Sequence, residues 1–279
     1  MAGRALVLGG GGVTGVAWEL GLLAGLVEEG VDITHPDVLV GTSAGAAVAG
    51  IIAGGLLRER YEAQLQGPGD EIPERLGLGL LARWGWHMVR SHTLEQFGAR
   101  IGAMALATPT IPAARRKAVF ESRIGLGVGW PDDIELKVTA VDAETGKFVV
   151  FDRSSGVPLI DAVVASCAVP GVWPPAEVAG RRYIDGGMRS AVNADLVSGA
   201  ERVIIIAPII RGGGLLAPPG KQAAALRAAG TQVVLASPDA KALKAIGTNV
   251  LDPARRKPAA EAGFAQAKAE AAAIKELWG

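Results

Sequence analysis

Residues 38–57 read VLVGTSAGAAVAGIIAGGLL, and the organisation of the chain follows from this stretch. A short aliphatic run leads into a tight turn, and a run of small residues suited to a buried helix follows it. The turn Gly41-Thr42-Ser43-Ala44-Gly45 has the G-x-S-x-G spacing of a nucleophile elbow, which exposes a serine hydroxyl between a strand and a helix. Side chains at Gly41 and Gly45 would collide with the neighbouring strand or block the turn. We therefore expect Ser43 at the tip of a sharp strand-to-helix turn.

The same stretch has a second interpretation, because its twenty uncharged residues between Asp37 and Arg58 match the length of a membrane span. Five of these residues are glycine, and Thr42 and Ser43 lie within the run. Glycine breaks on both sides of the serine suit a turn better than a continuous helix. A buried strand followed by a buried helix is the expected structure.

The flanking sequence predicts an α/β fold with a mostly parallel central sheet. Residues 5–8 form an apolar run that ends in four glycines, and residues 15–26 have helical apolar spacing. Two successive strand–turn–helix units imply parallel strands with right-handed crossovers. Further strands are expected at residues 134–141, 148–151, 182–184, 203–207 and 232–236. We expect one domain over residues 1–279, with its core motifs in 5–207 and a C-terminal extension in 208–279.

Residues 56–130 lack a strand pattern and predict a helical insertion over one end of the sheet. This segment contains a group of apolar side chains suited to an acyl pocket, to transient contact with a membrane surface or to an ordinary helical core: Leu76, Leu78, Leu80, Leu81, Trp84, Trp86, Met88 and Val89.

Charge and cysteine content limit the function classes. The chain has 28 Lys and Arg against 28 Asp and Glu, so it offers no charge excess for a nucleic-acid partner. The single cysteine, Cys167, has no partner for an internal disulfide and no metal-ligand companion. The apolar run near the N-terminus is too short for a signal-peptide core. We expect a cytoplasmic protein.

A nucleophilic serine needs a base, and histidine is the residue most often used. The chain has only His35, His87 and His92, so no histidine follows the late strands as a hydrolase triad would require. Asp185 is the better candidate, because Gly186 and Gly187 let the backbone turn away and leave the carboxylate in a crevice at the sheet edge. A surface Asp-Gly turn remains the alternative for this segment.

The glycine-rich loop Gly10-Gly11-Gly12-Val13-Thr14-Gly15 offers unhindered N–H groups at the start of a helix, a place suited to a developing negative charge. The loop also satisfies the G-x-G-x-x-G pattern of dinucleotide-binding enzymes, with Asp32 as the acid about twenty residues on. Asp32 precedes the second strand instead of ending it. A nucleotide-binding oxidoreductase nevertheless stays open as an alternative.

The ordered set Gly10–Gly15, Gly41–Gly45 and Asp185-Gly186-Gly187 resembles the patatin-like phospholipases, in particular their bacterial single-domain branch. Residues 165–175, ASCAVPGVWPP, are similar to a segment that precedes the acid in that family. The resemblance implies a three-layer α/β/α fold and a Ser–Asp dyad that hydrolyses acyl esters of lipids without a metal or other cofactor. By position, Ser43 would be the nucleophile and Asp185 the base, with the amides of Gly11 and Gly12 as the oxyanion hole.

One position departs from that family pattern, since Thr14 stands where the family usually has Arg or Lys in the glycine loop. A catalytically weak or inactive lipid-binding protein of the same fold is therefore the second alternative. We expect Thr14 to cap the following helix.

Overall fold

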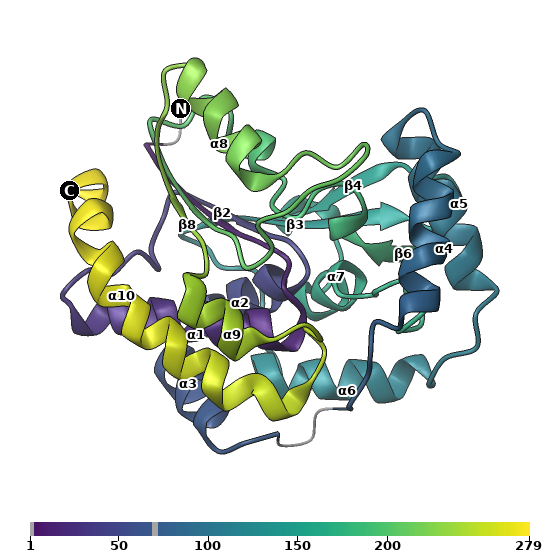
Figure 1. The fold of residues 1–279 in the computed structure, drawn as a ribbon, viewed down its shortest axis with the longest axis horizontal. Helices are drawn as coiled ribbons and strands as arrows, with labels where there is room; N and C mark the ends of the chain where they lie inside the picture. Colours follow the sequence, from purple (N-terminus) through teal and green to yellow (C-terminus); the bar gives the residue numbers. More distant parts are fainter. Residues whose placement is uncertain (1–2, 69–71) are drawn as a thin grey trace.

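The computed structural model describes residues 3–68 and 72–279, which form a mixed, mostly parallel sheet between two layers of helices (Figure 1). Eight strands in these residues belong to the sheet, in the order β5-β6-β3-β2-β1-β7-β8 with β4 paired to β3. The parallel strands are β1 (Arg4–Leu8), β2 (Val38–Gly41), β3 (Glu135–Asp142), β7 (Arg202–Ile206) and β8 (Gln232–Ala236). The α/β/α fold class expected from the sequence is confirmed.

The remaining three strands form antiparallel pairs. β4 (Phe148–Phe151) forms the expected hairpin with β3, and β6 (Arg181–Asp185) is also antiparallel to β3. β5 (Ala176–Val178) pairs with β6. The sequence pattern located β6 but not its direction, because direction depends on long-range pairing and not on local periodicity.

Alternating residues of the central strands face the two helical layers. In β1, Leu6 and Leu8 pack against one core cluster, whereas Ala5 and Val7 pack against the other. The first layer contains α1 (Gly12–Glu28), α2 (Ala44–Ala53), α7 (Leu159–Ser166), α9 (Ala240–Ile246) and α10 (Arg256–Trp278). The second contains α8 (Pro219–Ala228), which lies on the opposite side of the sheet in Figure 1.

Residues 38–57 divide into β2 and α2, as expected for a buried strand and helix. None of the helices in residues 3–68 and 72–279 is both long and apolar enough to cross a bilayer. The membrane-span interpretation of this stretch is therefore wrong.

Helix α10 packs along α1 at very short range. A Cβ atom on Gly21 would lie 2.1 Å from the Ala260 carbonyl oxygen, and one on Gly263 would lie 2.2 Å from the Trp18 carbonyl oxygen. The indole N–H of Trp18 donates a hydrogen bond to Gln266. This contact fixes α1, and with it the glycine loop from which α1 begins.

The insertion is helical, as expected, and contains α3 (Leu57–Leu65), α4 (Leu78–Val89), α5 (Leu94–Leu106) and α6 (Ala113–Ile124). The expectation that it covers one end of the sheet is only partly right, because its helices separate. α4 and α5 pack together near β3 and β6, whereas α3 packs on α1 and α10, and α6 packs on α2 and α7 (Figure 1). No residue of α4 is fully buried, but Leu80, Trp84 and Met88 pack partly buried against the core cluster of α5, so one face of α4 has the expected helical packing.

Candidate active site

Ser43 occupies the turn between β2 and α2 with a positive φ of 53°. Such a conformation is strained for a residue with a side chain and persists only where the surroundings enforce it. Here the close packing of the turn against β1 enforces it. A Cβ atom on Gly45 would lie 2.1 Å from the carbonyl oxygen of Leu8 in that strand. On Gly41 it would lie 2.6 Å from the Cα atom of Ala46. The two glycines thus let α2 start directly against β1.

Two neighbouring residues hold the Ser43 backbone in this conformation. The N–H of Ser43 donates to Ser166 Oγ at 2.9 Å, and the thiol of Cys167 donates to the Ser43 carbonyl oxygen at 2.9 Å. Ser166 is the last residue of α7, and Cys167 follows it directly. Sequence reasoning noted this segment only as part of a resemblance and assigned these two side chains no role.

Asp185 lies beside Ser43, whose hydroxyl donates a hydrogen bond of 2.6 Å to Asp185 Oδ2. The other carboxylate oxygen, Oδ1, accepts the Gly187 N–H at 2.7 Å, and a Cβ atom on Gly187 would lie 2.9 Å from the same oxygen. At Gly186 a Cβ atom would lie 2.3 Å from Thr139 Oγ1, so a larger residue has no room. The alternative of a surface Asp-Gly turn is wrong, since only 3% of Asp185 is exposed.

The pairing of β6 with β3 places Asp185 near the carboxyl end of β3, close to the Ser43 turn. Asp185 is the last residue of β6 and pairs with Ala140 of β3, so β6 covers only the carboxyl half of that strand. Gly41 of β2 pairs with Val138, two positions earlier on the same side of β3, because β4 pairs along the opposite side. The Ser43 turn and the end of β6 therefore meet on one side of β3, near the carboxyl edge of the parallel strands, although β6 is antiparallel to them.

Burial governs the electrostatics of Asp185. Desolvation raises the pKa of its carboxyl group to about 6, although hydrogen bonds from Ser43 and Gly187 act in the opposite direction. A carboxylate with this pKa is ionised at neutral pH and is more basic than an exposed aspartate. It is thus better suited to accept a proton from Ser43.

The glycine loop presents free N–H groups beside this pair. The N–H of Gly10 is used by the Ala191 carbonyl oxygen at 2.7 Å. Within the described residues, no acceptor bonds the N–H groups of Gly11 and Gly12, and both residues line the cavity that contains Ser43. A Cβ atom on Gly11 would lie 2.5 Å from Pro208, and Gly12 has a φ of +62°. Gly15 bonds back to Gly11 through its N–H and continues α1.

Thr14 does not cap α1, so that expectation is wrong. The helix begins at Gly12, and Gly11 occupies the cap position without any side-chain hydrogen bond. Thr14 is fully buried in the first turn, where its N–H donates to the Val250 carbonyl oxygen at 3.1 Å and its hydroxyl contacts the same oxygen at 3.4 Å. The residue therefore attaches the glycine loop to the segment that precedes α10.

Glu19 is a buried acid that sequence reasoning missed. It is fully inaccessible to solvent, and its Oε1 accepts the Gly9 N–H at 3.1 Å. Burial raises the pKa of its carboxyl group well above the ordinary value of 4.5. Its position on the inner face of α1 identifies it as a support for the start of the glycine loop.

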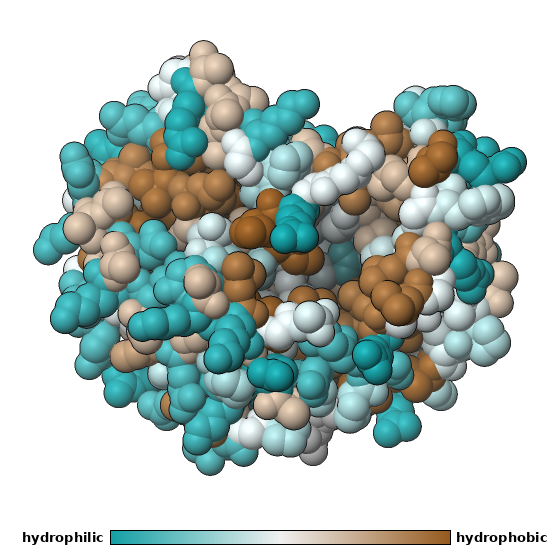
Figure 2. Space-filling view, viewed as in Figure 1, coloured by the Kyte–Doolittle hydropathy of each residue, from teal (hydrophilic) through white to brown (hydrophobic). Residues whose placement is uncertain are grey.

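An apolar cavity of about 190 Å³ opens beside Ser43 and Asp185. Its walls come from α4, from the loops after β6 and β7, and from the segment before α10, and its apolar lining includes Leu76, Trp84, Val169, Met188, Ile209, Leu216, Val250 and Leu251. Figure 2 shows this face hollowed near its centre, with apolar side chains along the border of the hollow. Of the residues expected for an acyl pocket, Leu76 and Trp84 line the cavity.

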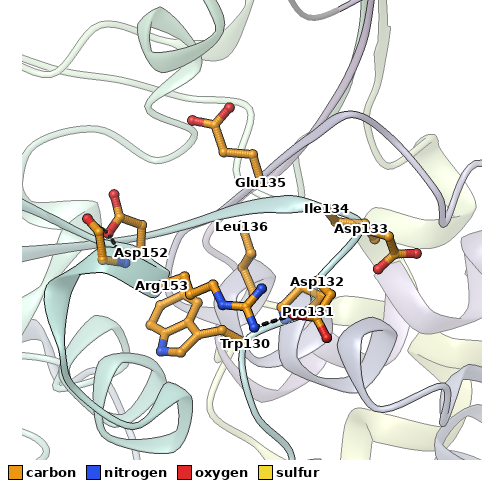
Figure 3. A pocket seen from close by; sticks show the side chains of 10 residues that line it. Trp130, Pro131, Asp132, Asp133, Ile134, Glu135, Leu136, Asp152 and Arg153 are labelled. Carbon is orange, nitrogen blue, oxygen red and sulfur yellow. Dashed lines mark hydrogen bonds and ion pairs between the residues drawn. The ribbon is translucent and has the colours of Figure 1, made fainter.

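A larger cavity of about 350 Å³ lies elsewhere, at the amino end of β3 (Figure 3). Three of its acidic residues make local contacts: Asp132 pairs with Arg153, Glu135 pairs with Lys137, and Asp152 accepts the Ser154 hydroxyl at 2.7 Å in an exposed capping turn. Across residues 3–68 and 72–279, no group of three or more His, Cys, Asp or Glu side chains is arranged to hold a metal ion. The described residues of this cavity therefore form no metal site.

The other sequence candidates lie away from Ser43. In the part of the chain that the structure describes, no histidine is hydrogen-bonded to Ser43 or Asp185. Asp32 lies before β2, at the edge opposite the glycine loop, and its carboxylate accepts hydrogen bonds from Thr34. It cannot reach a ligand at that loop, so the dinucleotide-binding alternative lacks its acid.

Comparison with known proteins agrees with this architecture. The family model described as patatin-like phospholipase matches residues 6–198. Uncharacterized NTE family proteins of Mycobacterium bovis and Mycobacterium tuberculosis are 30% identical over 214 residues, which is 75% of this chain and 49% of each relative. The chain thus spans about half the length of these curated relatives.

Two solved structures are similar over 98% of this chain. VipD from Legionella pneumophila has a TM-score of 0.49 at 13% identity, with 67% of its chain covered. The type III effector protein ExoU has a TM-score of 0.46 at 16% identity, with 53% covered. The family model alone spans well over half of the sequence, and the chain belongs to the patatin-like phospholipase family.

Proposed function

We propose that this protein is a lipid acyl hydrolase in which Ser43 is the nucleophile and Asp185 is the base. The observation that carries the proposal is the 2.6 Å hydrogen bond from Ser43 Oγ to Asp185 Oδ2 beside an apolar cavity. A hydroxyl in direct contact with a buried carboxylate needs no imidazole to relay its proton.

In the first half of the reaction, Ser43 Oγ attacks the carbonyl carbon of an ester, and its proton passes to Asp185. The tetrahedral intermediate collapses when the alcohol leaves with the proton from Asp185, and the acyl group remains on Ser43. In the second half, water attacks the acyl-enzyme and gives a proton to Asp185. Release of the carboxylic acid returns that proton to Ser43.

The N–H groups of Gly11 and Gly12 are the proposed donors to the oxyanion. They lie at the start of α1, where the helix dipole favours negative charge, and they line the same cavity as Ser43. Gly10, Gly15, Gly41, Gly45, Gly186 and Gly187 support the site by shaping the loop, the turn and the Asp185 segment.

The cavity indicates a long apolar acyl group as the part of the substrate that is bound. Its lining is mainly aliphatic and aromatic, and its volume of about 190 Å³ accommodates part of a chain whose remainder extends through the opening. We therefore propose lipid esters, and not small polar esters, as substrates.

Helix α4 supplies the proposed contact with a lipid surface. One of its faces exposes Leu78, Trp86 and Val89 at 86%, 56% and 85%, while Trp84 on another face lines the cavity. Arg90 stacks on Trp86 with its guanidinium 4.7 Å from the ring centroid. An apolar helix face with adjacent arginines suits peripheral binding to a membrane that contains anionic lipids.

A lipid-binding protein with little catalysis is the second candidate, and one observation favours it. Thr14 places no cation in the glycine loop and instead bonds to Val250. The oxyanion would then depend on backbone N–H groups without a charged side chain nearby in that loop.

Hydrolysis of an activated acyl ester and of a panel of phospholipids tests the proposal with three proteins: wild type, Ser43→Ala and Asp185→Asn. We expect each variant to lose at least about 1,000-fold in kcat while keeping a folded circular-dichroism spectrum. Ser122→Ala, an exposed serine on α6, is the matched control and should behave as wild type. Undiminished turnover by Ser43→Ala would refute the proposal, whereas lipid binding without turnover in wild type would support the second candidate.

A further inference from the structure

Asn193 is a fully buried polar residue that follows the Asp185 segment and belongs to none of the motifs that mark the site. Its backbone lies in the left-handed region with a φ of 49°, which asparagine tolerates better than most residues with a side chain. The N–H of Asn193 donates to Ser190 Oγ at 2.9 Å. A buried amide side chain needs partners for both its oxygen and its nitrogen, so its contacts identify what the residue holds.

Arg189 fixes the orientation of the Asn193 amide. Its guanidinium donates to Asn193 Oδ1 at 2.8 Å, and it is itself held by both carboxylate oxygens of Asp195 at 2.7 and 2.6 Å. The same guanidinium lies 4.2 Å from the Phe148 ring centroid. Because a guanidinium can only donate, the amide oxygen must face Arg189, and the NH₂ group must face the opposite way.

The NH₂ group of Asn193 connects the serine turn to the segment that follows the proposed base. It donates to the Ser190 carbonyl oxygen at 2.9 Å and to Thr42 Oγ1 at 3.0 Å, with Thr139 Oγ1 at 3.3 Å. Thr42 directly precedes the nucleophile, and its hydroxyl lies 2.9 Å from that of Thr139. Both threonines are fully buried. One amide group therefore joins two parts of the site that come from distant parts of the chain.

The segment before Asn193 also holds the glycine loop. The Ala191 carbonyl oxygen accepts the Gly10 N–H at 2.7 Å. Gln222 of α8 donates to Ser190 Oγ at 2.8 Å and so holds the segment from the second helical layer. Residues 190–193 thus contact the glycine loop through a backbone carbonyl and the serine turn through the Asn193 side chain.

We propose that Asn193 is a positioning residue for hydrolysis, whose amide keeps the serine turn, the Asp185 segment and the glycine loop in register. The inference rests on the proposed acyl hydrolase function and adds a residue to it. Among the described residues, no hydrogen bond joins Asn193 to Ser43 or Asp185, so Asn193 acts through Thr42 and the backbone of residues 190–193.

This arrangement predicts an effect on kcat and not on KM. Neither Asn193 nor Thr42 lines the apolar cavity, so substrate binding should not depend on them. A displacement of about 1 Å between reacting groups can cost about 100-fold in rate. Loss of the amide should therefore slow the attack of Ser43 while the substrate still binds.

Kinetics with an activated acyl ester tests the role of the amide in four variants. Asn193→Gly keeps access to the left-handed backbone and removes the amide. Thr42→Val removes its hydroxyl acceptor with little change of shape, and Thr42→Ser retains that hydroxyl. Thr231→Val is the matched control, because it also removes a buried hydroxyl, one that donates to the Ala200 carbonyl oxygen at 3.0 Å just before β8, at the opposite edge of the sheet.

We expect kcat to fall about 100-fold in Asn193→Gly and about tenfold in Thr42→Val, with KM changed by less than about twofold in both. Thr42→Ser should recover most of the loss in Thr42→Val. Thr231→Val should keep the wild-type kcat although its melting temperature falls. The double variant with Asn193→Gly and Thr42→Val should be no slower than Asn193→Gly alone, since both changes remove the same contact.

Hydrogen–deuterium exchange gives a readout that does not require turnover. In Asn193→Gly and in Thr42→Val, peptides that cover residues 8–14 and 38–46 should exchange about tenfold faster than in wild type. The same peptides should be unchanged in Thr231→Val. A wild-type protein that shows these exchange differences but no hydrolysis would refute the proposed function and leave the structural connection through Asn193 intact.

Three results would overturn the inference. The first is wild-type kcat in a folded Asn193→Gly or, if that variant does not fold, in Thr42→Val. The second is unchanged exchange of both peptides in the same variant. The third is an equal loss of kcat in Thr231→Val at a similar melting temperature, which would make the effect one of general stability.

Discussion

Ser43 Oγ donates a 2.6 Å hydrogen bond to Asp185 Oδ2, although the two residues are 142 positions apart in the chain. The contact forms beside the carboxyl half of β3, because Gly41 of β2 pairs with Val138 and Asp185 of β6 pairs with Ala140, two positions further along that strand. Its chemistry depends on burial, since Ser43 is 8% and Asp185 3% exposed. The proposed proton transfer between the two side chains would therefore be largely shielded from bulk water.

The pKa of Asp185 predicts the pH dependence of hydrolysis. Burial raises this pKa to about 6, and only the ionised form can accept the Ser43 proton. With a neutral ester, kcat/KM should therefore be constant above pH 7 and fall about tenfold per pH unit well below pH 6. A rate profile that stays flat down to pH 4.5 would show that Asp185 is not the base.

Substitution of Ser166 should lower kcat through its hydrogen bond to the Ser43 backbone, and not through a contact with the substrate. Ser166→Ala leaves the buried Ser43 N–H without its acceptor, which should cost about 1–3 kcal/mol of unfolding free energy. Because the turn then loses one of its restraints, kcat should fall about tenfold or more with little change in KM. Denaturant titration and steady-state kinetics measure the two effects. Unchanged kcat in a destabilised variant would restrict Ser166 to a structural role.

Even the smallest side chain at position 45 should destabilise the turn. Gly45→Ala would bring a Cβ atom to 2.1 Å from the Leu8 carbonyl oxygen, so α2 could not lie against β1 as it does. We expect a loss of about 3 kcal/mol or more, or no folded protein. Gly220→Ala in α8 is the control, because a Cβ atom there would meet no tertiary neighbour among the described residues within 4 Å, and alanine favours helix. Similar melting temperatures for both variants would contradict the close approach.

Glu19 predicts how stability depends on pH. Its pKa is raised in the folded protein, so its contribution is fully present below the unfolded value of about 4.5 and is lost as pH rises through the folded pKa. Glu19→Gln cannot titrate, and its unfolding free energy should decrease less between pH 5 and pH 8.5 than that of wild type. Asp185 contributes equally to both proteins in this comparison. Parallel pH curves would mean that Glu19 is ionised in the fold.

Local pattern was sufficient for the main architecture. The glycine turns and apolar runs located β1, β2, α1 and α2, because backbone conformation at a glycine turn is determined by neighbouring residues. The direction of β6 and the separation of the insertion helices were not predictable, since both depend on contacts between distant segments.

The sequence predicted the two central residues of the candidate site, Ser43 and Asp185, but not the residues that support them. Motif glycines flank Ser43 and follow Asp185, whereas Glu19 and Ser166 lie in helices and Cys167 directly follows one. Thr14 shows the same limit: its spacing suggested a helix cap, but α1 begins two residues earlier and its side chain bonds to Val250 instead. A contact with a residue more than two hundred positions away leaves no local signal.

Labelling with a fluorophosphonate, followed by intact-mass and peptide mass spectrometry, tests the central claim most directly. The reagent forms a covalent bond only with an activated serine, so it reports the nucleophile without requiring the natural substrate. We predict one adduct per wild-type chain, located on Ser43, none with Ser43→Ala, and a rate at least about 100-fold lower with Asp185→Asn. An adduct on another residue, or wild-type labelling rates in Asp185→Asn, would contradict the assignment of Ser43 and Asp185 as nucleophile and base.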